Sequence, residues 1–193
     1  MFDFSFFSLA ILLGSGLAMD AFSVSLANGL HEPSMKLRKA LGISGMFALF
    51  QALMPMIGWV LIHTLVEQFK SFEKFIPWIA LALLSFIGGK MLYEGIKGEG
   101  DEGEAKPLSL SLLIAQGIAT SIDALSVGFT ISQYTFVPAL VNALIIALVT
   151  FAICIAGVKI GNKVGEKFSG KASIFGGAIL IFIGLEIFIT SFF

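Results

Sequence analysis

Six apolar runs, each of about the 20 residues that a helix needs to cross the ~30 Å hydrocarbon core of a bilayer, take up most of the chain. They lie at 5–28, 40–63, 75–96, 108–131, 136–158 and 172–193. Open strands do not cross lipid because their backbone groups would lack hydrogen-bond partners, and these runs are not the short alternating segments of a β-barrel. The sequence therefore predicts an all-α membrane protein with six transmembrane helices.

Charged residues are scarce in this chain. The 193 residues are 57% hydrophobic and only 13% charged, whereas about a quarter of an ordinary soluble domain is charged. The single cysteine, Cys154, excludes a disulfide framework and a thiolate-rich metal site. The chain begins Met1-Phe2-Asp3, without a basic segment or a cleavage site, so we expect the first run to be a permanent span and not a signal peptide.

The lysines and arginines predict the orientation. Ten of the twelve lie in or beside the loops after the first, third and fifth runs: Lys36, Arg38, Lys39, Lys90, Lys97, Lys106, Lys159, Lys163, Lys167 and Lys171. The opposite side has Lys70 and Lys74. Because basic loops stay in the cytoplasm, we expect these three loops inside and both termini outside in a multi-pass protein.

The two halves of the chain repeat each other. Asp20-Ala21-x-Ser23-Val24 recurs 103 positions later as Asp123-Ala124-x-Ser126-Val127, and Phe86-Ile87-Gly88 recurs 96 positions later as Phe182-Ile183-Gly184. A repeat of three spans, an odd number, inverts the second half relative to the first, as in many secondary transporters. We therefore predict two inverted three-helix repeats, residues 1–98 and 107–193, joined by an acidic, glycine-rich cytoplasmic linker at 99–106.

Each repeat places one aspartate, Asp20 or Asp123, near the middle of an apolar run. A charge at that depth costs roughly 2.5–3.5 kcal/mol, so a function is the first expectation. Hydroxyl groups lie one helical turn away, and carboxylate, hydroxyl and amide oxygens together suit a hard divalent cation such as Mn²⁺ or Mg²⁺. The candidate ligands are Asp20, Asp123, Ser23, Ser126, Gln51 and Thr120. The alternative is that each aspartate only forms a hydrogen bond to a neighbouring helix.

Other polar residues in the runs have structural interpretations. Gln51 lies one turn before Pro55, and it has two open roles: a cation ligand, or a partner for the carbonyls that the proline leaves without a donor. Asn28 is interpreted as the end of the first helix, together with Gly29. The stripe Gly157-x-x-x-Gly161-x-x-x-Gly165 predicts close helix packing and no chemistry.

Lys90 and Glu186 occupy matching positions after the Phe-Ile-Gly motifs. The favoured interpretation of Lys90 is structural: its ammonium group reaches the cytoplasmic surface and pairs with Glu94 on the same helix face. A direct ion pair between Lys90 and Glu186 is the weaker alternative, because matched positions in inverted repeats lie at opposite depths unless they are near the midplane.

Four stretches of the chain resemble a known family. Gly16-Leu-Ala-Met-Asp-Ala-Phe-Ser-Val-Ser25, Pro55-Met-Ile-Gly-Trp59, Gly88-Gly-Lys-Met-Leu-Tyr-Glu-Gly95 and Ala119-Thr-Ser-Ile-Asp-Ala-Leu-Ser-Val-Gly128 resemble the bacterial manganese efflux pumps of the MntP type, within the lysine-exporter-like superfamily. The resemblance implies a six-helix exporter of Mn²⁺ in the bacterial inner membrane. By this resemblance, the aspartates of the family's motifs correspond to Asp20 and Asp123. Some members have glutamate at the position of Gln51. Manganese is then the transported substrate, and no cofactor is implied.

Other functions remain as alternatives. One is export of another divalent cation or of an amino acid, for whose carboxylate Lys90 is the only candidate partner inside the runs. A remote one is an intramembrane aspartyl protease, but neither aspartate has that family's Gly-x-Gly-Asp setting. The chain has no GxxxxGK[ST] loop, so we expect that ATP is not the direct energy source. Exchange for protons is a hypothesis for the coupling, because carboxylates in a low dielectric take up protons more readily. The expected partners are the cation and the lipid bilayer, without nucleic acid, and the sequence specifies no oligomeric partner.

Overall fold

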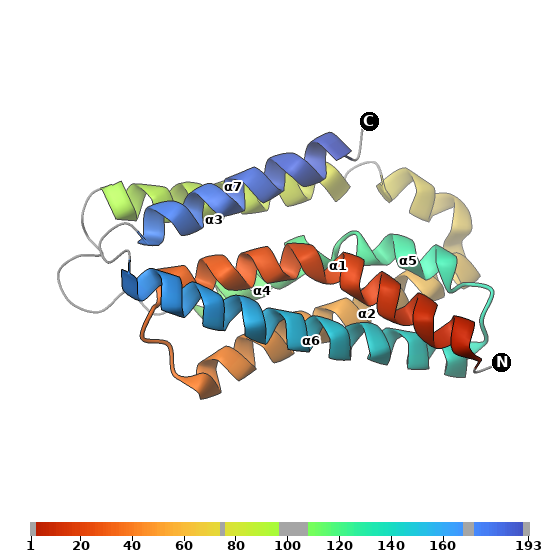
Figure 1. Ribbon diagram of the computed structural model, residues 1–193. Helices are drawn as coiled ribbons and strands as arrows, with labels where there is room; N and C mark the ends of the chain where they lie inside the picture. Colours follow the sequence, from red (N-terminus) through yellow and green to blue (C-terminus); the bar gives the residue numbers. More distant parts are fainter. Residues whose placement is uncertain (1–2, 74–75, 97–107, 168–171, 191–193) are drawn as a thin grey trace.

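The computed structural model describes residues 3–73, 76–96, 108–167 and 172–190, and these residues are helical apart from short connections (Figure 1). The helices are α1 (Phe4–His31), α2 (Leu37–Glu73), α3 (Ile76–Ile96), α4 (Leu110–Ser121), α5 (Ala124–Thr130), α6 (Phe136–Lys167) and α7 (Ala172–Thr190). The predicted all-α class is confirmed. The predicted linker at 99–106 and the side chain of Glu94 lie outside the described residues.

Three of the described helices are long and apolar enough to cross a membrane: Phe4–His31, Leu37–His63 and Phe136–Gly165. Two shorter apolar helices, Leu110–Ser121 and Ile174–Ile183, accompany them. These segments fall in α1, α2, α6, α4 and α7 and overlap five of the six runs predicted from the sequence. Together they define a multi-pass membrane protein.

The fourth run does not form the continuous helix that the sequence predicted at 108–131. It breaks at Ile122–Asp123 into α4 and α5. The carboxylate Oδ1 of Asp123 accepts a hydrogen bond from the backbone N–H of Ala124 at 2.9 Å, and a side chain that binds its local backbone competes with helical hydrogen bonds. The following amides bond three residues back, from Leu125 to Ile122 and from Ser126 to Asp123, as in a tight 3₁₀ turn. In contrast, Asp20 lies within the unbroken α1.

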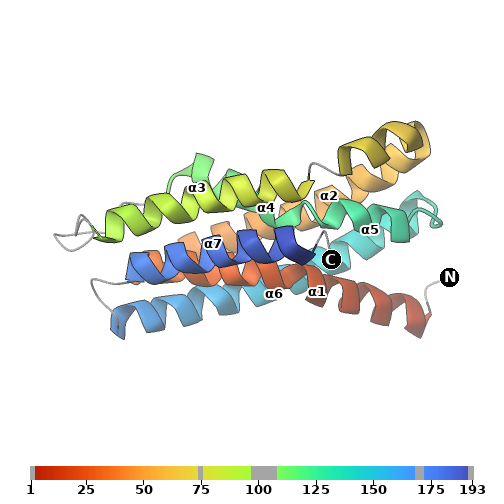
Figure 2. The same ribbon diagram turned by 90° about the horizontal axis from the view of Figure 1, so that it is seen from above.

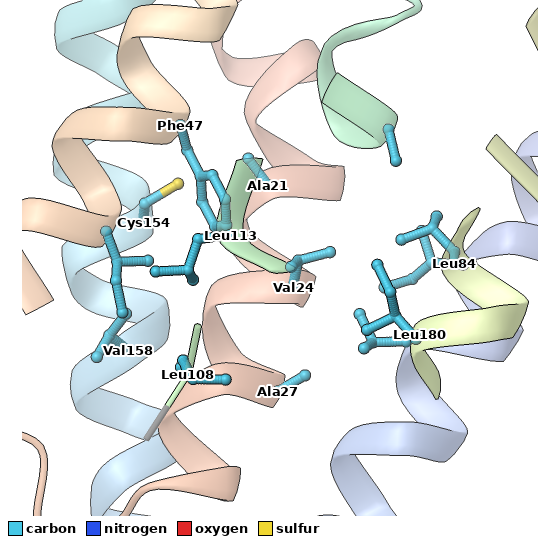
Figure 3. Close-up of a cluster of buried hydrophobic side chains, with 14 of the residues drawn as sticks. Ala21, Val24, Ala27, Phe47, Leu84, Leu108, Leu113, Cys154, Val158 and Leu180 are labelled. Atoms are coloured by element: carbon cyan, nitrogen blue, oxygen red, sulfur yellow. The ribbon is translucent and has the colours of Figure 1, made fainter. Parts of the chain in front are cut away.

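α1 is the central helix of the bundle. It packs most extensively along α6 and also contacts α7, while α3 and α7 lie side by side along one face (Figures 1 and 2). Figure 3 shows Ala21, Val24 and Ala27 of α1 pointing into the main apolar cluster. The other labelled residues come from α2, α3, α4, α6 and α7, apart from Leu108, which lies just before α4: Phe47, Leu84, Leu108, Leu113, Cys154, Val158 and Leu180. Small residues on α1 let several helices approach it at once.

Glycines set the closest helix contacts. A Cβ added at Gly29 of α1 would lie only 3.0 Å from the Cα of Gly161 and 2.9 Å from the N of Asn162, both on α6. A Cβ at Gly157 would lie 2.8 Å from the carbonyl oxygen of Phe22. The predicted close-packing role of the glycine stripe in the fifth run is therefore confirmed.

The described helix ends alternate along the bundle as an up-and-down chain requires. The C-terminal ends of α1, α3 and α6 and the starts of α2, α4 and α7 lie at one end, on the left in Figure 1. The start of α1 and the turn between α5 and α6 lie at the other end. At the first of these ends Lys39 forms an ion pair with Glu32. The described helix ends that flank the three loops predicted to be cytoplasmic thus lie at the same end of the molecule.

Candidate cation-binding site

Asp20 and Asp123 lie close enough in space for their charges to interact. Asp20 is half-buried near the middle of α1, and it also interacts electrostatically with Glu186 of α7. The carboxyl group of Asp20 is thus influenced by acidic groups from the α4–α5 junction and from α7. Carboxylates that repel one another at membrane depth are costly unless protons or a cation neutralise them. The sequence did not lead us to expect that Glu186 interacts with Asp20. The feature that could have indicated this was a single glutamate inside the last apolar run.

Acidic groups alone do not complete a metal site here. Among the described residues, no three histidine, cysteine, aspartate or glutamate side chains lie close enough together to hold a metal ion. A cation bound between Asp20 and Asp123 therefore needs further oxygen ligands from hydroxyl, amide or backbone groups, as Mn²⁺ and Mg²⁺ accept.

The break between α4 and α5 determines the setting of Asp123. Asp123 lies at this interruption, and the residue is exposed at the surface of the chain although protein atoms surround its carboxyl group. Ser126, one turn later, is exposed on α5. Interrupted helices in transporters commonly carry the groups that bind the substrate.

Gln51 joins the two segments that carry the aspartates. Its side-chain Nε2 donates hydrogen bonds to the carbonyl oxygen of Leu17 at 3.3 Å and to that of Thr120 at 2.9 Å. Leu17 and Thr120 are equivalent under the 103-residue repeat, and each lies three residues before an aspartate. Gln51 therefore satisfies backbone carbonyls, but those of α1 and α4 and not those released by Pro55. Its Oε1 is fully buried and has no hydrogen-bond partner among the described residues.

The predicted hydroxyl ligands lie in different environments. The Thr120 side chain is 1% exposed, and its Oγ1 donates to the carbonyl oxygen of Gln116 at 2.9 Å. Ser23 is half-buried, and its Oγ donates to the carbonyl oxygen of Met19 at 3.0 Å. A hydroxyl that donates its proton keeps oxygen lone pairs for another partner. The structure thus brings Asp20 near Asp123 and bonds Gln51 to the Thr120 backbone, whereas the hydroxyl of Ser23 bonds to its own helix.

Asn28 and Gln116 form a contact that the sequence interpretation missed. Asn28 Nδ2 donates to Gln116 Oε1 at 2.8 Å, and Gln116 Nε2 donates to Asn28 Oδ1 at 3.1 Å. Both side chains are fully buried between α1 and α4. The interpretation of Asn28 as a helix end is wrong, because α1 continues to His31 and has Glu32 as its C-cap. The sequence feature that could have predicted this contact was the presence of two amide side chains inside apolar runs.

Lys90 lies far along the bundle from Glu186. It is exposed on α3 between Gly88 and Leu92, both of which pack against Gly177 of α7. Glu186 is nine residues further along α7, about 13 Å of helix rise. This separation is too great for the direct ion pair that was the weaker alternative.

The fold and the buried polar groups define a class of protein. A multi-pass helical chain that buries amide groups between its helices and carries aspartates within its apolar runs has the construction of a membrane transport protein.

The comparisons with known proteins specify the family. The family model described as "Putative manganese efflux pump" matches residues 34–188. A protein of Methanosarcina mazei named "Putative manganese efflux pump MntP" is 43% identical over 176 residues, which cover 91% of this chain and 92% of the relative. Proteins with the same name from Bacteroides thetaiotaomicron and Ruminiclostridium cellulolyticum are each 40% identical, over 94% and 95% of this chain and 95% of either relative. No solved structure matches.

The chain therefore belongs to the MntP family of manganese efflux pumps. The resemblance found in the sequence motifs is confirmed. Because the relatives are named as efflux pumps, the family indicates a transporter and not an enzyme.

Proposed function

We propose that this protein is a secondary transporter that exports Mn²⁺ from the cytoplasm through a site between its two repeats. Asp20 and Asp123 provide the charge, and Gln51, Thr120, Ser23 and Ser126 provide further oxygen ligands. The protein crosses the bacterial inner membrane six times, with α4 and α5 together forming the fourth span and with both termini outside. The family membership supports the substrate, and the placement of acidic and amide groups supports the site.

The observation that carries the proposal is the pair of hydrogen bonds made by Gln51. One amide group bonds to the carbonyls of Leu17 and Thr120, so these two repeat-equivalent positions lie at the same depth and next to each other. Asp20 and Asp123 follow each of them by three residues, about one helical turn. In inverted repeats, equivalent positions meet only near the symmetry axis, where the substrate sites of such transporters lie.

Glycine packing gives independent support for the inverted repeat. Gly58 and Gly161 are equivalent under the 103-residue offset and lie in the second helix of each repeat. Gly161 on α6 packs against Gly29 on α1, and Gly58 on α2 packs against Gly128 on α5. In both cases the second helix of one repeat closely approaches the first span of the other, as a two-fold relation between inverted halves requires.

The chemistry of the groups favours a hard or borderline cation. Two carboxylates balance the charge of one divalent ion, and the buried Oε1 of Gln51 is an amide oxygen without a partner among the described residues. Lys90, the candidate partner for an amino-acid carboxylate, is exposed on α3, which disfavours amino-acid export.

The proposed cycle exchanges Mn²⁺ for protons. The empty aspartates bind the cation from the cytoplasmic side, the repeats rearrange, and protons from outside displace the cation. Two protons carry the same charge as one Mn²⁺, so the charge of the two-aspartate site is equal in both loaded forms.

Transport by purified protein tests the function and the site separately. Proteoliposomes with wild-type protein should take up Mn²⁺ along an opposing proton gradient, and Asp20→Asn and Asp123→Asn should each lower the initial rate by at least about tenfold, as expected for loss of a metal contact. Asp3→Asn is the matched control, since Asp3 caps the start of α1 outside the site and should leave the rate within about twofold. No Mn²⁺ movement by the wild type would disprove the function, and normal rates in both site variants would disprove the site.

A further inference from the structure

The Asn28–Gln116 pair is placed between the two helices that lead to the aspartates. Asn28 lies eight residues after Asp20 on α1, about 12 Å along the helix, and Gln116 lies seven residues before Asp123 on α4, about 10 Å. Both offsets point toward the end of the bundle where α1 and α6 end and α2 and α4 begin. The pair therefore lies between the aspartates and the end predicted to be cytoplasmic.

The opposite end of the bundle has no such polar contact at the equivalent positions. Under the 103-residue offset, Asn28 corresponds to Ile131 and Gln116 to Leu13. Both of these residues belong to one apolar cluster. An exact inverted repeat would place the same residues at both ends. This chain instead has amide side chains at one end and apolar side chains at the equivalent positions of the other.

The helix that carries Gln116 is also suited to move. α4 is separated from α5 by the break at Ile122–Asp123 and contacts α1 much less extensively than α6 does. Two amide hydrogen bonds between the side chains of Asn28 and Gln116 join α1 to α4. Water or a hydrated cation can replace such bonds with its own, because amide groups offer both donors and acceptors.

We propose that the Asn28–Gln116 pair is the cytoplasmic gate of the transport path. This inference rests on the proposed function. The gate is closed while both hydrogen bonds join α1 to α4, and it opens when α4 turns about the break at Ile122–Asp123. The amide oxygens of Asn28 and Gln116 then face the incoming divalent cation on its way to Asp20 and Asp123. The apolar residues Leu13 and Ile131 close the opposite end.

Thiol accessibility tests the gate without measuring Mn²⁺ transport. In a Cys154→Ala background, Ser23→Cys places a thiol beside Asp20, and a membrane-impermeant thiol reagent is applied from either side of the membrane. Asn28→Ala with Gln116→Ala should raise the labelling rate from the cytoplasmic side by about tenfold, the shift expected for loss of two buried hydrogen bonds. Labelling from the outside should stay unchanged.

The equivalent apolar positions provide the matched control. Leu13→Ala with Ile131→Ala should raise labelling of the same thiol from the outside and leave the cytoplasmic rate unchanged. Unaltered cytoplasmic labelling in the Asn28/Gln116 variant, in protein that still purifies as a folded species, would overturn the gate.

Cross-linking separates a moving contact from a static one. A short reducible bis-thiol reagent joining Asn28→Cys to Gln116→Cys, again in the Cys154→Ala background, should stop Mn²⁺ transport, and reduction should restore it. The control joins Ser25→Cys on α1 to the native Cys154 on α6, whose side chains are neighbours, and should leave transport intact. Full transport by the cross-linked gate pair would contradict the proposed gate. If the wild type moves no Mn²⁺, only the proposed function is contradicted, because the labelling experiment still tests the gate.

Discussion

At the scale of single residues, Gln51 links its own helix α2 to both α1 and α4. It is an amide inside an apolar helix, and both donors of its Nε2 group are used by carbonyls on two other helices. A carbonyl oxygen that loses a buried donor costs about 1–3 kcal/mol. Gln51 therefore holds α1 and α4 in register.

Replacement of Gln51 by methionine, which has a similar volume but no donor, should weaken both folding and transport. We expect the free energy of unfolding in detergent to fall by about 1–3 kcal/mol, because the Leu17 and Thr120 carbonyls lose their bonds from Nε2. Thermal unfolding measures this loss. Gln133→Met is the control, since Gln133 is exposed in the turn before α6 and should change stability by less than about 0.5 kcal/mol. Equal effects of the two substitutions would refute this role of Gln51.

At the scale of helices, the packing depends on close backbone contacts and not on a hydrophobic driving force, because lipid is as apolar as the helix surfaces. The α1–α6 contact shows this most clearly, with Gly29, Gly157 and Gly161 lining it. The α4–α5 break is the other helix-scale feature, since it exposes Asp123 and separates α4 from the rest of its span.

Two glycine substitutions in α1 should have opposite effects on stability. Gly29→Ala places a methyl group against the α6 backbone, 2.9 Å from the N of Asn162, and should cost about 1–3 kcal/mol through overpacking. Gly16→Ala has nothing within 4 Å of the added Cβ, and it should be neutral or stabilise the helix by up to about 1 kcal/mol. Thermal unfolding of both variants in detergent measures the difference, and a Gly29→Ala variant as stable as Gly16→Ala would show that α1 and α6 are not in close contact.

At the scale of the whole molecule, the helix ends divide into two groups that match the distribution of basic residues. The described helix ends that flank the three lysine- and arginine-rich segments lie at one end, and the uncharged α5–α6 turn lies at the other. The proposed direction of export depends on this orientation, because the amide gate and the basic loops lie at the same end.

Labelling of intact cells with an impermeant thiol reagent should establish the orientation. In the Cys154→Ala background, Thr135→Cys in the exposed α5–α6 turn should react, and Lys36→Cys in the exposed α1–α2 connection should react only after the cells are permeabilised. The positive-inside rule gives this expectation. The reverse labelling pattern would invert the topology and assign the amide gate to the outside.

The sequence by itself determined the helical class, the apolar runs, the repeat and the two aspartates, because hydropathy and sequence motifs are local properties of the chain. The motifs also identified the family. The tertiary structure alone decided that the fourth run breaks at Asp123, that Gln51 bonds to Leu17 and Thr120, that Asn28 pairs with Gln116, and that Glu186 comes near Asp20. The physical reason is that each of these features depends on how helices rotate and cross. Many rotations of an almost wholly apolar helix bury the same hydrophobic surface, so only the contacts between helices select one of them.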